Sequence, residues 1–235
     1  MKFHPDFFAS QNKKISYSHI AVFAALFIIA LSHINCLIGD SSAEKKRVCC
    51  IGNSITEGSW LQDVVNESYP AKLAQYLGTA YDVLNLGNGG ACILKQADGP
   101  YWSLDKIDRA IAYKPGIIVI MLGTNDSKPY NWVYKDSFEV NYSSFIDTLV
   151  TIQPVPKIWL CLPPPAWDNV FDISGTTIQN EVIPLIKKVA RQRNLPLIDC
   201  HTSFLKYKQY FPDGVHPDKD GAAYLAALVS RAIGL

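Results

Sequence analysis

The stretch Ile117-Ile118-Val119-Ile120-Met121-Leu122 is apolar at every position. A strand of this composition is buried on both faces, as happens in a parallel sheet that helices cover. Beyond residue 46, other short apolar runs alternate with amphipathic stretches, which is the pattern that such a sheet requires. We therefore predict five strands, which are Arg47 to Ile51, Tyr81 to Leu86, Ile117 to Leu122, Lys157 to Leu162 and Leu195 to Asp199.

The amphipathic stretches predict the covering helices, because their apolar residues recur with helical spacing. Pro70 lies in the first turn of one helix and Gly78 stops it, while Asp136 and Glu139 resemble a capping box for another. The expected helices are Tyr69 to Leu77, Ser103 to about Tyr113, the stretch behind Asp136, the stripe from Ile178 to Val189 with Pro184 as a kink or a late start, and Ala222 to Ile233. Together these elements predict an α/β fold, a flavodoxin-like three-layer α/β/α sandwich with a five-stranded parallel sheet, in one domain over residues 46–235.

Polar segments follow four of the predicted strands. Ser54 comes after the first strand, the glycine-rich segment 85–90 after the second, segment 123–126 after the third, and Asp213 with His216 after the fifth. In an open parallel sheet, residues beyond the carboxyl ends of the strands converge on one crevice. Each segment alone reads as an ordinary turn, but four of them in this order favour a shared site.

The segment Asp213-Gly214-Val215-His216-Pro217 sets a carboxylate three positions before an imidazole in a tight loop. A serine hydroxyl is a poor nucleophile until a neighbouring base takes its proton, and that base must be held in the right tautomer. His216 is suited to the first task and Asp213 to the second. We therefore predict Ser54 as the nucleophile, His216 as the general base and Asp213 as the orienting acid.

Acyl transfer also needs hydrogen-bond donors for the oxygen that becomes negative in the tetrahedral intermediate. The candidates are the backbone N–H of Ser54, the backbone N–H of Gly90 and the side-chain amide of Asn125. Gly90 has no β-carbon to keep a ligand away, and the amide of Asn125 donates without carrying charge. Asn125 followed by Asp126 is also typical of a turn or a helix cap.

Across residues 46–235 the chain resembles the SGNH, or GDSL, hydrolase family. The resemblance rests on four blocks in the family's order, which are Ile51-Gly52-Asn53-Ser54-Ile55-Thr56-Glu57-Gly58, Asn85-Leu86-Gly87-Asn88-Gly89-Gly90, Gly123-Thr124-Asn125-Asp126 and Asp213-Gly214-Val215-His216-Pro217. It implies Ser54 as nucleophile and first oxyanion donor, Gly90 and Asn125 as further donors, and Asp213 and His216 as acid and base. One departure is Asn53, which stands where the family usually has an aspartate.

Two further segments, Ser-Lys-Pro-Tyr-Asn-Trp at 127–132 and Leu-Pro-Pro-Pro-Ala-Trp at 162–167, resemble a bacterial subgroup described as sialate O-acetylesterase-like. We predict an esterase that hydrolyses small acyl esters, with an acetyl group on a sugar first among them, through an acyl-enzyme on Ser54. Tyr130, Trp132 and Trp167 are candidate sugar contacts on the rim of the site, and packing residues are the alternative for them.

Two other functions stay open: a lipase or lysophospholipase, and a catalytically silent carbohydrate-binding protein on the same scaffold. We expect no cofactor and no metal, because no ligand cluster such as HExxH occurs. The formal net charge is +1 and the chain has no basic stripe, so we expect no nucleic-acid partner. The expected partner is a small-molecule or glycan ester, and the oligomeric state stays open.

Residues 1–40 differ from the rest of the chain. Three lysines precede the uncharged apolar run 20–31, which predicts an export signal, with a cut after Ser32. The rival is an uncleaved membrane anchor, although a span needs about 20 apolar residues. A lipid on Cys36 is a third option. We therefore expect an exported protein, in the periplasm or outside the cell, or held at the membrane by this segment alone.

Six cysteines occur, without a CxxC pair or the spacing of zinc ligands. Cys49, Cys50, Cys161 and Cys200 lie in apolar runs. We expect them to be buried thiols that act as small hydrophobic residues, with disulfides as the alternative.

Overall fold

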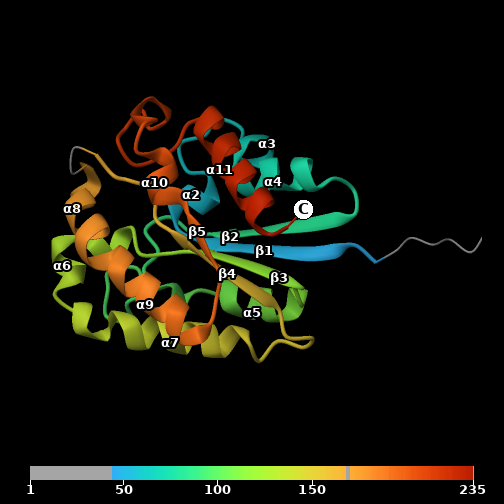
Figure 1. Cartoon of the computed structure of the whole chain (residues 1–235), viewed down its shortest axis with the longest axis horizontal. Helices are drawn as coiled ribbons and strands as arrows, with labels where there is room; N and C mark the ends of the chain where they lie inside the picture. The colour runs from blue at the N-terminus through green and yellow to red at the C-terminus, as the bar shows by residue number, and fades with distance from the viewer. Residues whose placement is uncertain (1–43, 168–169, 235) are drawn as a thin grey trace, which may run out of the picture. The chain divides into compact units, whose positions relative to one another are not determined.

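The computed structural model describes residues 44–167 and 170–234. Its centre is a parallel sheet of five strands in the order β2-β1-β3-β4-β5, which lies between two layers of helices in Figure 1. The strands are β1 (Lys46–Gly52), β2 (Tyr81–Gly87), β3 (Ile117–Met121), β4 (Lys157–Leu162) and β5 (Leu197–Asp199). The predicted fold and its five strands are confirmed. Strand β5 starts at Leu197 rather than Leu195, because Pro196 has no N–H to donate to the ladder.

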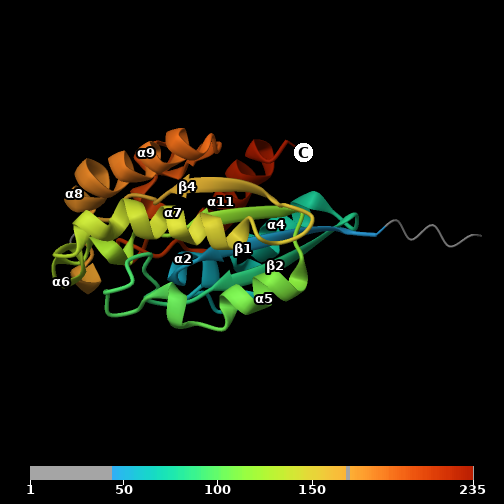
Figure 2. The ribbon, with the colours of Figure 1, turned by 90° about the horizontal axis from the view of Figure 1, so that it is seen from below.

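Helices α5 (Lys106–Tyr113), α7 (Phe138–Leu149) and α9 (Ile183–Arg193) cover one face of the sheet, and α4 (Tyr69–Leu77) and α11 (Lys219–Ala232) cover the other (Figures 1 and 2). Ile118 and Ile120 of β3 point into the core beneath α5, α7 and α9. Val119 and Met121 point into the second core, beneath α4 and α11. The central strand is therefore buried on both faces, as its sequence predicts.

Short elements connect these layers. They are the helices α2 (Ser54–Glu57), α3 (Val64–Glu67), α6 (Pro129–Trp132), α8 (Gly175–Thr177) and α10 (Cys200–Phe204), the 3₁₀ turns η1 (Tyr101–Ser103), η2 (Asn125–Ser127), η3 (Lys135–Ser137), η4 (Val170–Asp172) and η6 (Lys208–Tyr210), and the π-helical turn η5 (Ile178–Val182).

Two predicted helix starts are wrong. Ser103 does not cap α5, because it belongs to η1 and its hydroxyl donates to the carbonyl of Pro100 at 3.1 Å. The capping box before α7 is also absent: Asp136 lies inside η3, and α7 starts without a side-chain cap. The Glu139 carboxylate instead accepts hydrogen bonds from Lys188 and Gln192 of α9, which draw it away from the helix start.

The last two helices begin before the predicted positions. Pro184 lies in the first turn of α9, but helical backbone already runs through α8 and η5. Helix α11 starts at Lys219, where the Asp218 carboxylate caps it by accepting from the N–H of Gly221 at 2.8 Å. Gly221 weakens the helical pattern in the sequence, so the first turn was not predicted.

Cys49, Cys50, Cys92, Cys161 and Cys200 are buried and form no disulfide. The expectation of buried thiols is therefore confirmed for Cys49, Cys50, Cys161 and Cys200. Burial raises the pKa of the Cys50 thiol to about 12. The predicted export signal or anchor over residues 1–40 and the lipid option at Cys36 fall outside the described residues. Within the ranges 44–167 and 170–234, no helix has both the length and the apolar character needed to cross a bilayer.

Gly52 lets the chain turn sharply at the end of β1. A β-carbon here would lie 2.8 Å from the carbonyl oxygen of Met121 and would also collide with the hydroxyl of Thr56 in α2. The Asn53 side chain then caps α2 by accepting from the N–H of Ile55 at 3.0 Å. Ser54 is therefore delivered to the tip of β1 as the first residue of a helix.

Asp126 ties the loop after β3 to the loop after β2. The carboxylate is fully buried, and its Oδ1 accepts from the N–H groups of Ile93 at 3.0 Å and Leu94 at 2.8 Å. Buried Asn131 joins the same two loops, because its amide donates to Asp98 at 2.8 Å and to the carbonyl of Asn125 at 3.0 Å. Burial raises the pKa of Asp126 to about 6, although the two N–H groups act in the opposite direction.

We expect Gly52→Ala to lower the free energy of unfolding by about 3 kcal/mol, because the backbone around Met121 must move to admit a methyl group. Urea denaturation measures this change. Gly116→Ala is the control, since its β-carbon would meet only the carbonyl of Arg47 at 3.9 Å, and its effect should stay within about 1 kcal/mol. Equal effects of the two substitutions would contradict the close approach.

We expect Asp126 to make the protein more stable as the pH falls from about 6 towards 4. Its folded pKa of about 6 lies above the ordinary 3.8, so between these values the folded state binds a proton that the unfolded state lacks. The free energy of unfolding should rise by roughly 3 kcal/mol relative to Asp126→Asn, which cannot titrate.

Denaturant unfolding of wild type and Asp126→Asn across this pH range measures the difference. Asp147→Asn is the control with the opposite sign, because Arg193 lowers the pKa of Asp147 and its contribution is lost as the pH falls. A difference between wild type and Asp126→Asn that does not change with pH would refute the assignment.

Candidate active site

Ser54, His216 and Asp213 meet at the carboxyl ends of the strands. The Nε2 atom of His216 lies 2.8 Å from the Ser54 hydroxyl, and its Nδ1 atom lies 2.7 Å from Oδ2 of Asp213. Ser54 is 8% exposed and His216 is 7% exposed, so substrate can reach the hydroxyl while little water surrounds it. The structure thus brings together the three residues that the sequence predicts as nucleophile, base and acid.

The Asp213 loop is shaped by its own hydrogen bonds. Oδ1 of Asp213 accepts from the N–H groups of Val215 at 2.9 Å and His216 at 2.7 Å. Gly214 adopts a φ of 85°, in the left-handed region, and its carbonyl accepts from the N–H of Trp167 at 2.9 Å. The loop therefore presents the imidazole to Ser54 in a fixed orientation.

The electrostatics of Asp213 favour its charged form. Burial alone would raise the pKa of this carboxyl, but the N–H groups of His216 and Val215 and the His216 ring outweigh burial and lower it. An ionised carboxylate beside Nδ1 keeps a proton on that nitrogen. Nε2 is then left as the acceptor for the hydroxyl proton of Ser54.

Two candidate oxyanion donors lie in the loops that Asp126 joins. Gly90 has a φ of 76°, the position of its absent β-carbon is open, and its N–H donates to no other described residue. The Asn125 amide donates one hydrogen to the carbonyl of Ala91 at 3.2 Å, which leaves its second hydrogen for another acceptor. The third candidate, the N–H of Ser54, belongs to the first residue of α2, where helices leave N–H groups unpaired. Their role as donors stays a prediction.

The three aromatic residues expected on the rim lie elsewhere or serve other contacts. Trp132 is a core residue, in agreement with the packing alternative: it packs on Phe138 and its indole N–H donates to Glu181 at 2.9 Å. Trp167 packs on Phe211 at 5.0 Å between ring centroids, behind the Asp213 loop. Tyr130 is half-exposed on α6. Sugar contacts by Tyr130 and Trp167 stay predictions.

Sequence reasoning missed Trp60 and Phe171, the two aromatic rings beside the imidazole. Their centroids lie 5.8 Å and 5.4 Å from that of His216, and 5.8 Å from each other. Trp60 is 72% exposed and Phe171 is 46% exposed, and both have a positive φ, of 74° and 56°. The available signal was an aromatic residue in a polar stretch six positions after the nucleophile.

A cavity of about 560 Å³ opens beside His216 and Asp213. Trp60 and Leu61 contribute apolar surface to it, and residues of α3 and the start of α11 contribute polar side chains. Neither Tyr130, Trp132 nor Trp167 lines this cavity. The space next to the imidazole is therefore built from segments 60–67 and 212–220.

The model of the GDSL-like lipase/acylhydrolase family matches residues 50–224. An acetylxylan esterase of Xylanibacter ruminicola is 37% identical over 205 residues, a match that covers 80% of this chain and 43% of that protein. The chain thus spans less than half the length of this relative.

Several solved structures share the fold. The aryl esterase of M. smegmatis superposes with a TM-score of 0.64 at 20% identity, over 80% of this chain and 98% of that one. The acetyl xylan esterase AlAXEase gives 0.64 at 24% identity, over 80% and 99%. Est24, a carbohydrate acetylesterase from Sinorhizobium meliloti, gives 0.63 at 18% identity, over 80% and 98%.

The predicted relationship to SGNH, or GDSL, hydrolases is confirmed by these matches, while the sialate O-acetylesterase-like subgroup stays a prediction. On the match to the family model and the identity with the esterase of X. ruminicola, this chain belongs to the GDSL-like lipase/acylhydrolase family, a family of carboxylic ester hydrolases.

Proposed function

We propose that this protein is a serine esterase that removes small acyl groups, acetyl first among them, from carbohydrate. The observation that carries the proposal is the unbroken series of hydrogen bonds from Asp213 through His216 to Ser54, at 2.7 Å and 2.8 Å. Such a series activates a hydroxyl for attack on an ester carbonyl.

In the first half of the reaction, the Ser54 oxygen attacks the carbonyl carbon of the ester and Nε2 of His216 takes the hydroxyl proton. The carbonyl oxygen becomes negative and accepts hydrogen bonds from the N–H groups of Ser54 and Gly90 and from the Asn125 amide. Collapse of this intermediate breaks the bond to the alcohol oxygen, which leaves with the proton from His216. The acyl group then stays on Ser54 as an ester.

In the second half, a water molecule attacks the acyl carbon while His216 takes one of its protons. The second tetrahedral intermediate collapses, the Ser54 oxygen regains a proton from His216, and the carboxylic acid departs. Asp213 stays ionised throughout and stabilises the imidazolium that forms twice in the cycle. The lowered pKa of Asp213 suits this role.

Two observations support a short acyl group on a sugar. The relative at 37% identity is an acetylxylan esterase. The cavity beside His216 offers polar side chains, among them Gln62, Glu67 and Asp220, as hydrogen-bond partners for a hydroxyl-rich group. A lipase or lysophospholipase would need an extended apolar track for its acyl chain.

The complete series of contacts between Asp213, His216 and Ser54 argues against a catalytically silent binding protein. A metal-dependent phosphoesterase lacks support as well. Within residues 44–167 and 170–234, no group of three or more histidine, cysteine, aspartate or glutamate side chains is arranged to hold a metal ion.

We expect Ser54→Ala and His216→Ala each to remove nearly all turnover, by about 10⁴-fold or more, because these residues act as one unit. Asn125→Ala should lose about 10²- to 10³-fold and leave a measurable rate, since other donors stay. Acetate release from acetylated xylo-oligosaccharides measures turnover, and fluorophosphonate labelling should depend on Ser54.

Ser103→Ala is the control, because this exposed serine of η1 only bonds the carbonyl of Pro100. Its turnover and labelling should equal those of wild type. Full activity of Ser54→Ala would end the serine mechanism, and faster cleavage of long-chain esters than of acetyl esters would support the lipase alternative.

We expect activity to fall as the pH is lowered, because a protonated His216 cannot accept the proton of Ser54. The pKa of Asp213 lies below its ordinary value, so its carboxylate stays charged and should not add a second protonation to the acid limb. The acid limb of log kcat/KM should therefore have a slope of about one and end in a plateau at higher pH. A flat profile, or a slope near two, would contradict this assignment.

A further inference from the structure

The cavity beside His216 lies where the alcohol part of an ester must go. His216 protonates the leaving oxygen, so the alcohol leaves from the side of Ser54 on which the imidazole lies. His216 and Asp213 line the cavity, whereas Ser54, Gly90 and Asn125 do not. An ester bound with its carbonyl carbon at Ser54 and its leaving oxygen at Nε2 of His216 would have its alcohol on the side of this cavity of about 560 Å³.

One wall of the cavity is the indole of Trp60. A tryptophan that is 72% exposed gains little from burial, and a φ of 74° costs a non-glycine residue of order 1 kcal/mol or more. Phe171 shares both features and packs against Trp60, so the two rings form an apolar shelf beside the imidazole. An exposed shelf of this kind suits the apolar face of a sugar ring.

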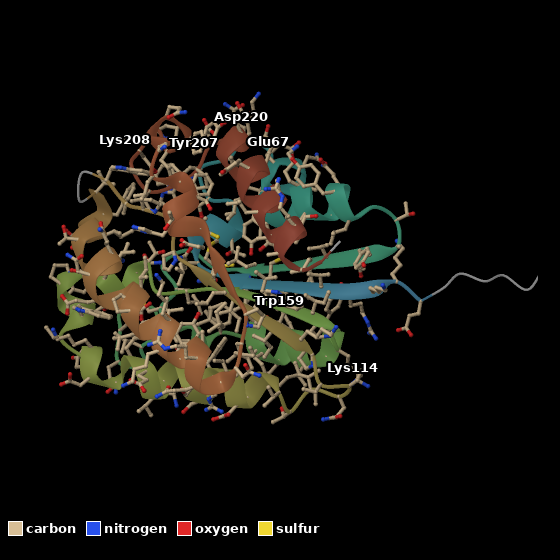
Figure 3. All side chains as sticks on the ribbon, in the orientation of Figure 1. Glu67, Lys114, Trp159, Tyr207, Lys208 and Asp220 are labelled. Carbon is tan, nitrogen blue, oxygen red and sulfur yellow. The ribbon has the colours of Figure 1, made fainter. Side chains whose placement is uncertain are left out.

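Another part of the cavity wall is acidic. Glu67 of α3 and Asp220 of α11 line the same cavity and lie close together at the top of Figure 3. With Asp213 and Asp218 they make four carboxylates, against the single ammonium group of Lys219 among the lining residues, so the formal charge of the lining is −3 when His216 is neutral.

Two of these carboxylates are already engaged. Asp213 holds the imidazole, and Asp218 caps α11 through the N–H of Gly221, which also offsets the positive end of the helix dipole. Glu67 makes one long contact, at 3.4 Å, with the N–H of Asp63. Glu67 and Asp220 therefore have acceptor capacity for hydroxyl groups in the cavity.

We propose that this cavity is a subsite for an uncharged sugar, and that its carboxylates disfavour sugars that carry their own carboxylate, such as hexuronic or sialic acids. Trp60 supports the ring, while Glu67 and Asp220 accept hydrogen bonds from its hydroxyl groups. Repulsion between like charges makes the same wall unfavourable for an anionic sugar. This proposal rests on the proposed esterase function, and it predicts a neutral substrate where the resemblance to sialate esterases predicts an anionic one.

The test compares acetylated methyl glucoside with acetylated methyl glucuronide, which differ in one carboxylate. We expect kcat/KM to favour the glucoside by about tenfold or more at low salt, and the ratio to shrink as salt screens the charges. In the double variant Glu67→Gln with Asp220→Asn, which keeps acceptor oxygens without charge, the ratio should fall towards one. A ratio near one in wild type, or a ratio unchanged in the double variant, would overturn the proposal.

The role of Trp60 is tested with ethyl acetate, which has no ring to stack. Trp60→Ala should raise KM for acetylated methyl glucoside about tenfold, whereas its effect on turnover of ethyl acetate should be several times smaller. Trp60→Phe should keep most of the affinity, and Tyr134→Ala is the control for loss of an exposed aromatic ring outside the cavity. Equal losses on both esters would mean that Trp60 only supports His216, which would overturn its role as a platform.

Binding by the Ser54→Ala variant separates the subsite from the reaction. An NMR titration with acetylated methyl glucoside should show binding to Ser54→Ala that weakens in Ser54→Ala with Trp60→Ala. Absence of binding would overturn the subsite even if wild type hydrolyses ethyl acetate. Hydrolysis of ethyl acetate that persists in Ser54→Ala would instead overturn the proposed serine mechanism.

Discussion

The contact between Nε2 of His216 and the Ser54 hydroxyl, at 2.8 Å, joins residues that are 162 positions apart. A single hydrogen bond contributes only about 1 kcal/mol net, so it cannot bring its own partners together. Packing must do so. The buried strand β1 and Gly52 at its end fix the position of Ser54. The hydrogen bonds within the Asp213 loop fix the imidazole. The two cores on either side of the sheet hold these segments in place relative to each other.

The loops opposite the imidazole depend on a different constraint. Asp126 and Asn131 join the segment after β2 to the segment after β3 through buried hydrogen bonds. The raised pKa of Asp126 means that its charged form is held at a cost in stability near neutral pH. The proposed oxyanion donors Gly90 and Asn125 lie on these joined loops. Donors that are already held in place need no reorganisation when negative charge develops in the transition state, and this lowers the barrier. The buried Asp126 carboxylate thus lowers the stability of the fold near neutral pH while its hydrogen bonds fix the geometry of the two loops.

The strands and the meeting of Ser54, His216 and Asp213 could be predicted from the sequence, because apolar runs and polar strand ends are local patterns with one geometric outcome. The start of α7 could not be predicted in the same way. The Glu139 carboxylate accepts hydrogen bonds from Lys188 and Gln192 of α9, and these partners are distant in the sequence. Burial of Trp132 could not be decided from the sequence either, because an aromatic residue suits a rim or a core equally well. The position of Trp60 beside the imidazole could not be predicted, because a tryptophan gives no sign in the sequence that its backbone adopts a left-handed conformation.

The five described cysteines are buried, and none of them forms a disulfide. Burial raises the pKa of the Cys49, Cys50 and Cys92 thiols, so oxidants and alkylating reagents find little thiolate to attack at these positions while the protein is folded. Within residues 44–167 and 170–234, the fold is therefore held together by packing and hydrogen bonds without a disulfide. A reducing agent would find no covalent cross-link to break in this part of the chain.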